Sequence, residues 1–173
     1  MGGAARRRDD HLQPARLRAA RVFEGEVRRA VRGDHARFGD PETEAVLPRL
    51  EGDLIPALEA CVDGTLCDAL IRVRPDVAAT VIMAAGGYPG AYTKGTPIHG
   101  LDEAAQVPDS LVFHAGTALK DGRVVTAGGR VLAVTALGPD LKTAVGRAYE
   151  AASKIRFEGA HYRTDIAHRA FSR

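Results

Sequence analysis

Hydrophobic residues recur at two spacings along the chain, and each spacing predicts a different kind of element. Intervals of three and four residues, which place apolar side chains on one face of a helix, occur over residues 47–62 and 141–155. The run VAATVIMAA after Asp76 is β-branched and almost wholly apolar, which is typical of a strand buried on both faces. SLVFHAG and RVLAVTALG are predicted to be further strands, and LKDGRVV a hairpin that turns at Asp121 and Gly122.

Together these elements predict an α+β fold, a mostly antiparallel sheet flanked by helices that cover one of its faces. The strands cluster between residues 76 and 138, with a short helix expected at LDEAAQV and a long helix after the last strand. The first helix is expected to end at Gly64, and Pro48 is expected to break or bend its early turns. Residues 1–36 have only weak helical spacing, so we expect a poorly defined arm there.

Length and composition limit the classes of function. A chain of 173 residues that is 45% hydrophobic can bury the core of one domain. Aromatic residues make up only 5% and Trp is absent, which argues against a stacking platform for single-stranded nucleic acid and against an aromatic belt at a membrane. No apolar run approaches the length of a membrane span, and the start of the chain lacks the apolar segment of a secretory signal. We therefore expect a cytoplasmic protein with neither a nucleic-acid nor a membrane partner.

The net charge of +2 hides an uneven distribution of charge. Residues 1–36 contain nine arginines and five acids, whereas the rest of the chain contains slightly more acids than bases. Because acids are interleaved with the arginines, we interpret this arm as a solvated segment. An arginine-rich nucleic-acid-binding arm is the weaker alternative, and it would show a steep dependence of binding on salt.

The chain has few residues arranged for covalent or metal chemistry. Cys61 and Cys67 lie six residues apart, a spacing that suits neither a CxxC redox motif nor a four-ligand zinc site, and we expect two partly buried thiols. No serine has a G-x-S-x-G setting, and the six histidines show no metal-ligand spacing.

Two stretches are candidate binding elements. The loop over residues 86–95, GGYPGAYTKG, has four glycines, which permit close backbone approach to a ligand or tight turns at a strand end. In RFGDPE, an arginine precedes a glycine turn, and Asp40 and Pro41 are expected to begin a helix, with the Asp40 side chain as its cap. A cation beside free backbone N–H groups suits a carboxylate or phosphate ligand, and plain helix capping is the alternative of equal weight.

The stretch RFGDPETE resembles the signature of the phosphoribosylamine–glycine ligase family, also called glycinamide ribonucleotide synthetase, in the ATP-grasp group. The similarity continues through VLPRLEGDL, AAGGYPGAYTKGTPIHGL, VFHAGTALKDGRVVTAGGRVLAVTALG and RAYEAASKIRFEGAHYRTDIAHRA, and so spans residues 37–170. The resemblance implies a purine-biosynthesis enzyme that joins phosphoribosylamine to glycine with ATP and magnesium, through a glycyl phosphate. It assigns residues 37–64 to the end of the ATP-grasp region with a linking helix, and residues 65–173 to the ligase C-terminal domain.

The same resemblance implies roles for individual residues. Arg37 would be catalytic, by stabilising the charged acyl-phosphate or tetrahedral species. The implied substrate-binding residues are Asp40 and Glu42, which would position the loop and the amine, and Gly86, Gly87 and Gly90, which would border the cleft. Gly33 and His35 stand where the family has the Glu and Asn that hold magnesium on ATP, so we expect no magnesium site in this chain.

The family enzyme is more than twice as long, and its N-terminal and ATP-grasp domains precede the matching region. We therefore expect this chain alone to bind ATP weakly or not at all and to be inactive without those domains. We also expect that the open reading frame joins unrelated or out-of-frame sequence, residues 1–36, to a genuine ligase C-terminus. The alternative is a stand-alone binding or scaffold module that docks a partner on its former domain interface, which a large exposed apolar patch would favour.

Overall fold

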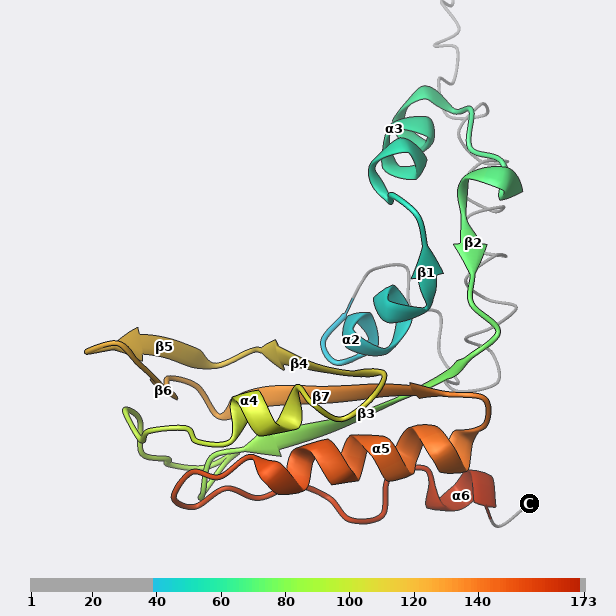
Figure 1. The fold of residues 1–173 in the computed structure, drawn as a ribbon. Coiled ribbons are helices and arrows are strands. Elements are labelled where there is room, and N and C mark those ends of the chain that lie inside the picture. The colour runs from blue at the N-terminus through green and yellow to red at the C-terminus, as the bar shows by residue number, and fades with distance from the viewer. Residues whose placement is uncertain (1–38, 172–173) are drawn as a thin grey trace, which may run out of the picture. The chain divides into compact units, whose positions relative to one another are not determined.

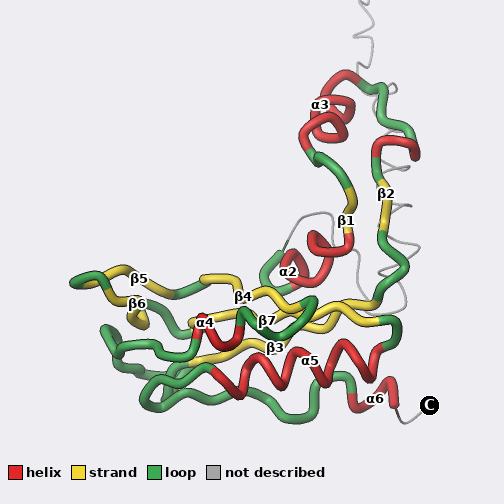
Figure 2. Tube along the Cα trace, viewed as in Figure 1, coloured by secondary structure: helices red, strands yellow, loops and turns green. Residues whose placement is uncertain are grey.

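The structure is a computed structural model that describes residues 39–171 (Figures 1 and 2). The arm predicted over residues 1–36 lies outside the described residues. The described chain belongs to two compact units, one formed by residues 50–74 and the other by residues 39–49 together with 75–171.

The smaller unit consists of a helix, a 3-10 turn and a short β-ladder. Its elements are β1 (Leu50–Glu51), α3 (Ile55–Asp63), a 3-10 turn η2 (Asp68–Leu70) and β2 (Arg72–Val73), with β1 and β2 antiparallel. Ala57, Ala60 and Leu66 are buried in its small core. As predicted, the helix ends at Gly64, whose φ of 71° lies in the left-handed region that glycine adopts without strain.

The helical pattern over residues 47–62 does not form one helix. It begins in a 3-10 turn, η1 (Leu47–Arg49), passes through strand β1, and becomes helical again only at α3. Pro48 lacks an N–H donor for the helical ladder, and Gly52 has a φ of 90°, which is incompatible with a right-handed helix. The break expected at Pro48 is thus more complete than a bend.

A three-stranded antiparallel sheet forms the centre of the larger unit. Its strand order is β3 (Val77–Ala84), β7 (Arg130–Gly138), β4 (Ser110–His114), with Val81 and Val112 both opposite Val134. The predicted hairpin is confirmed as β5 (Thr117–Lys120) and β6 (Arg123–Thr126), and both turn residues have positive φ, 51° at Asp121 and 73° at Gly122. The predicted α+β class is therefore confirmed.

Helices cover both faces of this sheet. α5 (Leu141–Lys154) runs along one face, and the short helix α2 (Glu42–Val46) lies on the other (Figure 1). The residues of β7 after Arg130 are buried throughout, which is the burial expected of a central strand covered on both sides. The expectation that helices cover one face is corrected in this respect, because α2 adds a second layer. α4 (Leu101–Ala104) and α6 (His168–Phe171) are single turns at the periphery.

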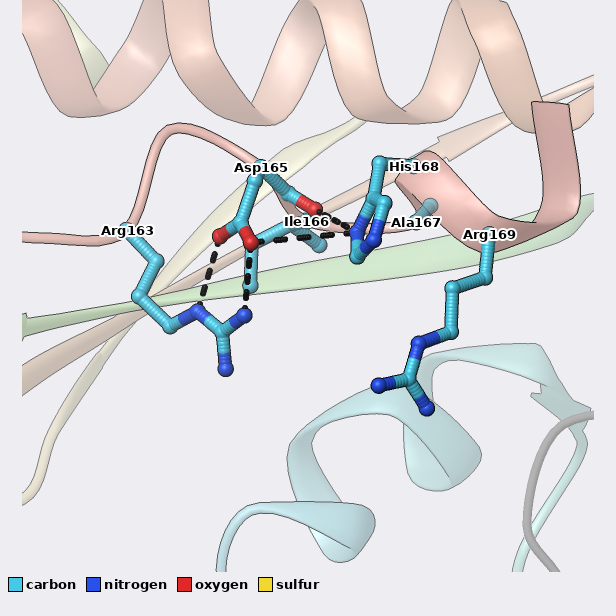
Figure 3. Close-up of a pocket in the computed structure, with 6 residues that line it drawn as sticks. All are labelled: Arg163, Asp165, Ile166, Ala167, His168 and Arg169. Atoms are coloured by element: carbon cyan, nitrogen blue, oxygen red, sulfur yellow. Dashed lines mark hydrogen bonds and ion pairs between the residues drawn. The ribbon is translucent and has the colours of Figure 1, made fainter. Parts of the chain in front are cut away.

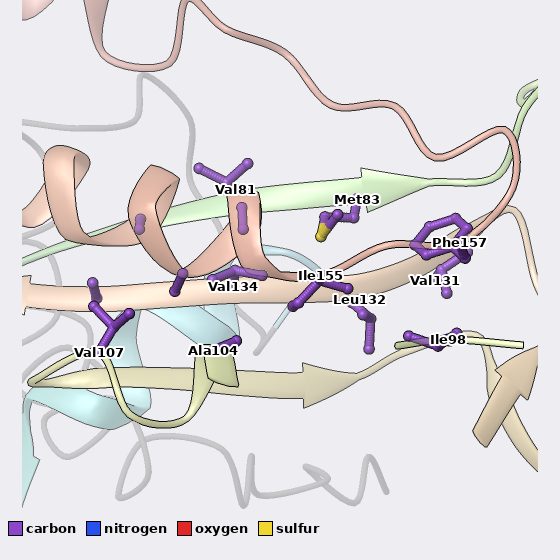
Figure 4. Close-up of a cluster of buried hydrophobic side chains, with 14 of the residues drawn as sticks. Val81, Met83, Ile98, Ala104, Val107, Val131, Leu132, Val134, Ile155 and Phe157 are labelled. Atoms are coloured by element: carbon purple, nitrogen blue, oxygen red, sulfur yellow. The ribbon is translucent and has the colours of Figure 1, made fainter. Parts of the chain in front are cut away.

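The core of the larger unit lies between the sheet and α5 (Figure 4). Val81, Met83, Leu132 and Val134 are fully buried, and small alanines on α5 allow the helix to approach them closely. Asp140 caps α5 by accepting a hydrogen bond from the Thr143 N–H at 2.8 Å.

No helix among the described residues combines the length and the apolar character that crossing a membrane requires.

Cys61 and Cys67 are exposed free thiols, so the expectation of partial burial was wrong. Cys61 lies on α3, a short helix that buries only Ala57 and Ala60, which explains its exposure.

Candidate functional site

The site predicted at RFGDPE begins with a compact turn over residues 39–42. Thr43 closes this turn, because its N–H and its hydroxyl both donate to the Gly39 carbonyl oxygen, at 2.9 and 2.6 Å. The carboxylate of Glu42 folds back over Gly39, so that a Cβ on Gly39 would lie 2.5 Å from Glu42 Oε2. A side chain at residue 39 would therefore displace this carboxylate. The Asp40–Pro41 peptide bond is cis.

Asp40 does not cap the helix that follows. The residue in the capping position of α2 is Pro41, and no side chain caps the helix. Asp40 Oδ2 instead lies 3.1 Å from Arg130 Nη2, and Arg130 Nη1 donates to the Asp40 carbonyl oxygen at 3.4 Å. The expectation that Asp40 acts as the cap was wrong, because the helix begins one residue later and the carboxylate pairs with a cation from another segment.

Arg130 is the residue that sequence reasoning missed. It is the first residue of β7 and lies opposite Ala84, where the register between β3 and β7 shifts. Its predecessor Gly129 accepts a hydrogen bond from the Ala85 N–H at 2.9 Å, and the ring of Tyr88 occupies the space that a Cβ on Gly129 would need. One signal in the sequence was available, a charged residue that follows two glycines and opens an otherwise apolar strand.

The glycines of the 86–95 loop serve close backbone packing within the chain. A Cβ on Gly86 would lie 3.1 Å from the Gly159 carbonyl oxygen, and one on Gly87, whose φ is 92°, would collide with the Ala91 carbonyl oxygen. A Cβ on Gly90 would lie 3.1 Å from the Gly87 carbonyl oxygen. The tight-turn interpretation therefore accounts for these three residues without a ligand, and their role at a substrate cleft stays a prediction.

Aromatic side chains and one lysine extend from the same loop. The rings of Tyr88 and Tyr92 meet edge to face with centroids 6.2 Å apart, and Lys94 Nζ lies 5.8 Å from the Tyr92 ring centroid. Since Tyr88 also lies against Gly129, these contacts connect the loop to the start of β7.

Strand pairing brings the two predicted binding stretches to one place. Arg130 pairs through its side chain with Asp40 and through its backbone register with Ala84, two residues before Gly86. Arg37, the predicted catalytic residue, lies outside the described residues, as do Gly33 and His35.

Beneath the turn, two hydroxyl groups connect the sheet to α2. The Thr135 hydroxyl donates to the Glu44 carbonyl oxygen at 2.9 Å, and the Thr80 hydroxyl lies 2.8 Å from that of Thr135. Because Thr135 has a single hydroxyl proton, which it gives to Glu44, Thr80 must be the donor in the second hydrogen bond. The Oε2 atom of Glu44 is buried and has no hydrogen-bond partner among the described groups.

Chemically, this arrangement offers carboxylates and a guanidinium group for positioning a polar ligand. It does not offer a metal centre, since no three His, Cys, Asp or Glu side chains within residues 39–171 gather as metal ligands. The backbone of the turn is fixed by Thr43 and Arg130, which leaves the Glu42 carboxylate as the acidic group beside Gly39.

Comparisons with known proteins agree on one family. The family model described as phosphoribosylglycinamide synthetase, C domain, matches residues 78–169. A phosphoribosylamine–glycine ligase from Synechocystis is 53% identical over 137 residues, which are 79% of this chain and 32% of that protein. The human trifunctional purine biosynthetic protein adenosine-3 is 50% identical over 80% of this chain and 14% of its own length.

A solved structure gives the same result. The crystal structure of a phosphoribosylamine–glycine ligase from Thermotoga maritima matches with a TM-score of 0.61 and 40% identity, over 75% of this chain and 31% of that one. The chain thus spans about a third of the length of the bacterial ligases that it matches.

Proposed function

The chain belongs to the family of phosphoribosylglycinamide synthetase C domains, and on that premise we propose that it forms the C-terminal part of a phosphoribosylamine–glycine ligase. Such a ligase is an ATP-dependent carbon–nitrogen ligase of purine biosynthesis, whose substrates would be phosphoribosylamine and glycine. The observation that carries this proposal is the similarity to ligases over about four fifths of the chain, including the turn at residues 39–42. We further propose a cytoplasmic location, as for a purine-biosynthesis enzyme.

Within such a ligase, Arg37 would face the negative charge that develops on the reacting carbonyl group. A guanidinium group fixed before the reaction stabilises such charge without the cost of reorganising. Asp40 and Glu42 would position the loop and the amine substrate. What supports this division of roles is that Arg130 holds Asp40, while the carboxylate of Glu42 is folded over Gly39.

We propose that Gly86, Gly87 and Gly90 border the same cleft. What supports this is that their loop follows β3, whose last residue, Ala84, is paired with Arg130, the residue that also holds Asp40. Backbone that is tightly packed in this way is fixed in position, which is a requirement for ordering a substrate.

The described residues do not fit a magnesium–ATP site. Magnesium prefers several oxygen ligands in near-octahedral geometry, and within residues 39–171 no three candidate side chains come together. We therefore propose that other parts of the ligase, on this polypeptide or on a separate one, hold the nucleotide and its metal. This part of the chain would order the substrates beside them.

The test is ADP release that depends on both glycine and phosphoribosylamine. The 173-residue chain is assayed alone and mixed with an N-terminal ligase fragment that ends before the residue aligned with Arg37. We expect release only in the mixture, and none when either substrate is omitted. Release by the chain alone would contradict the assignment of ATP binding to other parts, and no release from a folded mixture would contradict the proposed ligase function.

A docking module is the second candidate function, and one observation favours it. Ile55, Leu58 and Val62 recur along one side of α3 and are 60%, 49% and 82% exposed, while Ala57 and Ala60 are buried. Three exposed aliphatic side chains at helical spacing form a stripe that a partner could cover. Docking would be favoured over catalysis if the chain bound the N-terminal fragment without releasing ADP, and if this binding were lost when all three residues are changed to serine.

A further inference from the structure

The segment over residues 163–169 surrounds a pocket that none of the roles above uses (Figure 3). Its volume is about 310 Å³, which is at the lower end of the range for small-molecule sites. The residues that line it are Arg163, Asp165, Ile166, Ala167, His168 and Arg169.

The backbone of this segment is fixed by a tyrosine of α5. The Tyr149 hydroxyl donates to the Arg163 carbonyl oxygen at 2.9 Å and accepts from the Ile166 N–H at 3.0 Å. Ala167 has a φ of 63°, in the left-handed region, and packs on the buried cluster that contains Ala144. The backbone that carries the lining side chains is therefore attached to the core at Arg163, Ile166 and Ala167.

The negative charge of Asp165 is already compensated. Arg163 Nε donates to Asp165 Oδ1 at 2.8 Å and Nη2 donates to Oδ2 at 2.7 Å, a bidentate pair. These hydrogen bonds lower the pKa of Asp165 to about 2, so the carboxylate is ionised and Arg163 balances its charge. A guanidinium group has five N–H donors, so three donors of Arg163 are not used in this pair.

Arg169 adds a second positive charge to the pocket. The side chain of Arg169 makes no hydrogen bond or ion pair with any residue in the described part of the chain. Figure 3 shows the two arginine side chains reaching the same side of the segment, with His168 between them. The His168 Nδ1 atom lies 2.9 Å from the Asp165 carbonyl oxygen and 3.7 Å from Asp165 Oδ2, so this nitrogen is directed at Asp165.

We propose that this pocket binds a small phosphate-bearing molecule. Arg169 and the remaining donors of Arg163 supply charge-assisted hydrogen bonds to the phosphate oxygens, and Ile166 supplies an apolar wall for the rest of the ligand. A phosphate group fits better than a single carboxylate because it presents three acceptor oxygens to two separate guanidinium groups. This inference does not depend on the proposed ligase function.

The test is a titration of the isotope-labelled 173-residue chain with inorganic phosphate at constant ionic strength, followed by NMR. We expect saturable shifts of the amide signals of residues 163–169 and of the His168 ring. Arg169→Gln should weaken binding about tenfold, the effect of one charge-assisted hydrogen bond. Arg123→Gln, a matched change at another exposed arginine, should leave the affinity unchanged.

Ribose 5-phosphate forms the second arm of the titration, and tighter binding than that of inorganic phosphate would show that lining residues contact the ligand beyond its phosphate group. Shifts that do not saturate, or that occur outside this segment, would overturn the proposal. Equal affinity of the Arg169→Gln chain and the unchanged chain would also overturn it. Because Arg169 is exposed, this variant is expected to fold, and the signals of the sheet residues report whether it has.

Discussion

Arg130 and Asp40 are 90 residues apart in sequence and form an ion pair, with Arg130 Nη2 3.1 Å from Asp40 Oδ2. The side chains are 40% and 45% exposed, so water and salt screen the pair and its contribution to global stability is small. Its importance is positional, because it attaches the turn before α2 to the first residue of the central strand β7. The turn that carries two predicted substrate residues is thus held by the C-terminal sheet.

The first prediction concerns this attachment. Arg130→Gln removes the charge that holds Asp40, so hydrogen exchange at the amides of α2 (Glu42–Val46) should accelerate several-fold. The free energy of unfolding should fall by no more than about 1 kcal/mol, as is usual for exposed pairs. Hydrogen exchange and urea unfolding of the same samples separate the local effect from the global one.

Arg123→Gln is the matched control, because Arg123 is an exposed arginine on β6 and forms no part of the turn over residues 39–42. Asp40→Asn should accelerate the same amides, and the double variant should exchange no faster than either single one. Additive effects of the two changes would show that the ion pair does not hold the turn in solution.

The second prediction concerns the hydroxyl pair beneath α2. Thr135→Val leaves the Glu44 carbonyl oxygen without its donor and the Thr80 hydroxyl without its acceptor. Thr135 is fully buried, so the loss should lower the free energy of unfolding by about 1–3 kcal/mol. Urea unfolding measures this change.

Thr80→Val tests whether the two hydroxyls act together. On its own it should destabilise the protein, whereas in the Thr135→Val background it should cost at least about 0.5 kcal/mol less. Equal costs in both backgrounds would mean that Thr80 and Thr135 contribute independently.

Patterns that are local in sequence predicted most of the fold. The buried strand at VAATVIMAA, the hairpin at Asp121 and Gly122, and α5 follow from side-chain period and turn chemistry within a few residues. Such signals need no knowledge of distant segments.

What the sequence did not reveal depends on contacts between distant segments. The residues around Asp40 have the local pattern of a helix cap. The pattern does not reveal that the Asp40 carboxylate pairs with Arg130, because Arg130 lies far along the chain. The hydrophobic residues over 47–62 fit a helical period, but Leu50 pairs with Val73 and so forms part of a strand. Here a contact with a distant segment outweighs the local helical spacing. The pocket at Arg163 depends on the ion pair of Arg163 with Asp165 and on the hydrogen bond from the Tyr149 hydroxyl to the Arg163 carbonyl oxygen. No spacing of residues in the sequence predicts these contacts.

The third prediction is a dependence of stability on pH that arises at the start of α5. The hydrogen bond from the Thr143 backbone N–H lowers the pKa of Asp140 below its ordinary 3.8. A carboxyl group whose pKa is lower in the folded state stabilises that state above the ordinary value, and this contribution disappears as the pH falls through the lowered value. Asp140→Ala should therefore lower the unfolding temperature at neutral pH, and the difference should shrink below pH 3.8.

Asp140→Ser separates the hydrogen bond from the charge. Serine also caps helices, so this variant should be more stable than Asp140→Ala at neutral pH and should lose less stability than the unchanged chain in acid. Thermal unfolding across the acid range checks both expectations. A difference between Asp140→Ala and the unchanged chain that stays constant with pH would mean that the charge of Asp140 contributes nothing.

The last prediction concerns the close contact of Tyr88 with Gly129. A Cβ at residue 129 would collide with the Tyr88 ring, so Gly129→Ala should lower the free energy of unfolding by about 1–3 kcal/mol. Tyr88→Ala removes the obstacle, and in that background Gly129→Ala should cost about 1 kcal/mol less.

Gly146→Ala is a control for which we expect the opposite effect. Gly146 lies on α5, and a Cβ at this residue would have no neighbouring atom within 4 Å, so alanine should stabilise the helix by up to about 1 kcal/mol. If Gly129→Ala did not lower the free energy of unfolding, the ring of Tyr88 would not be held against β7, and the 86–95 loop would lack its connection to Arg130.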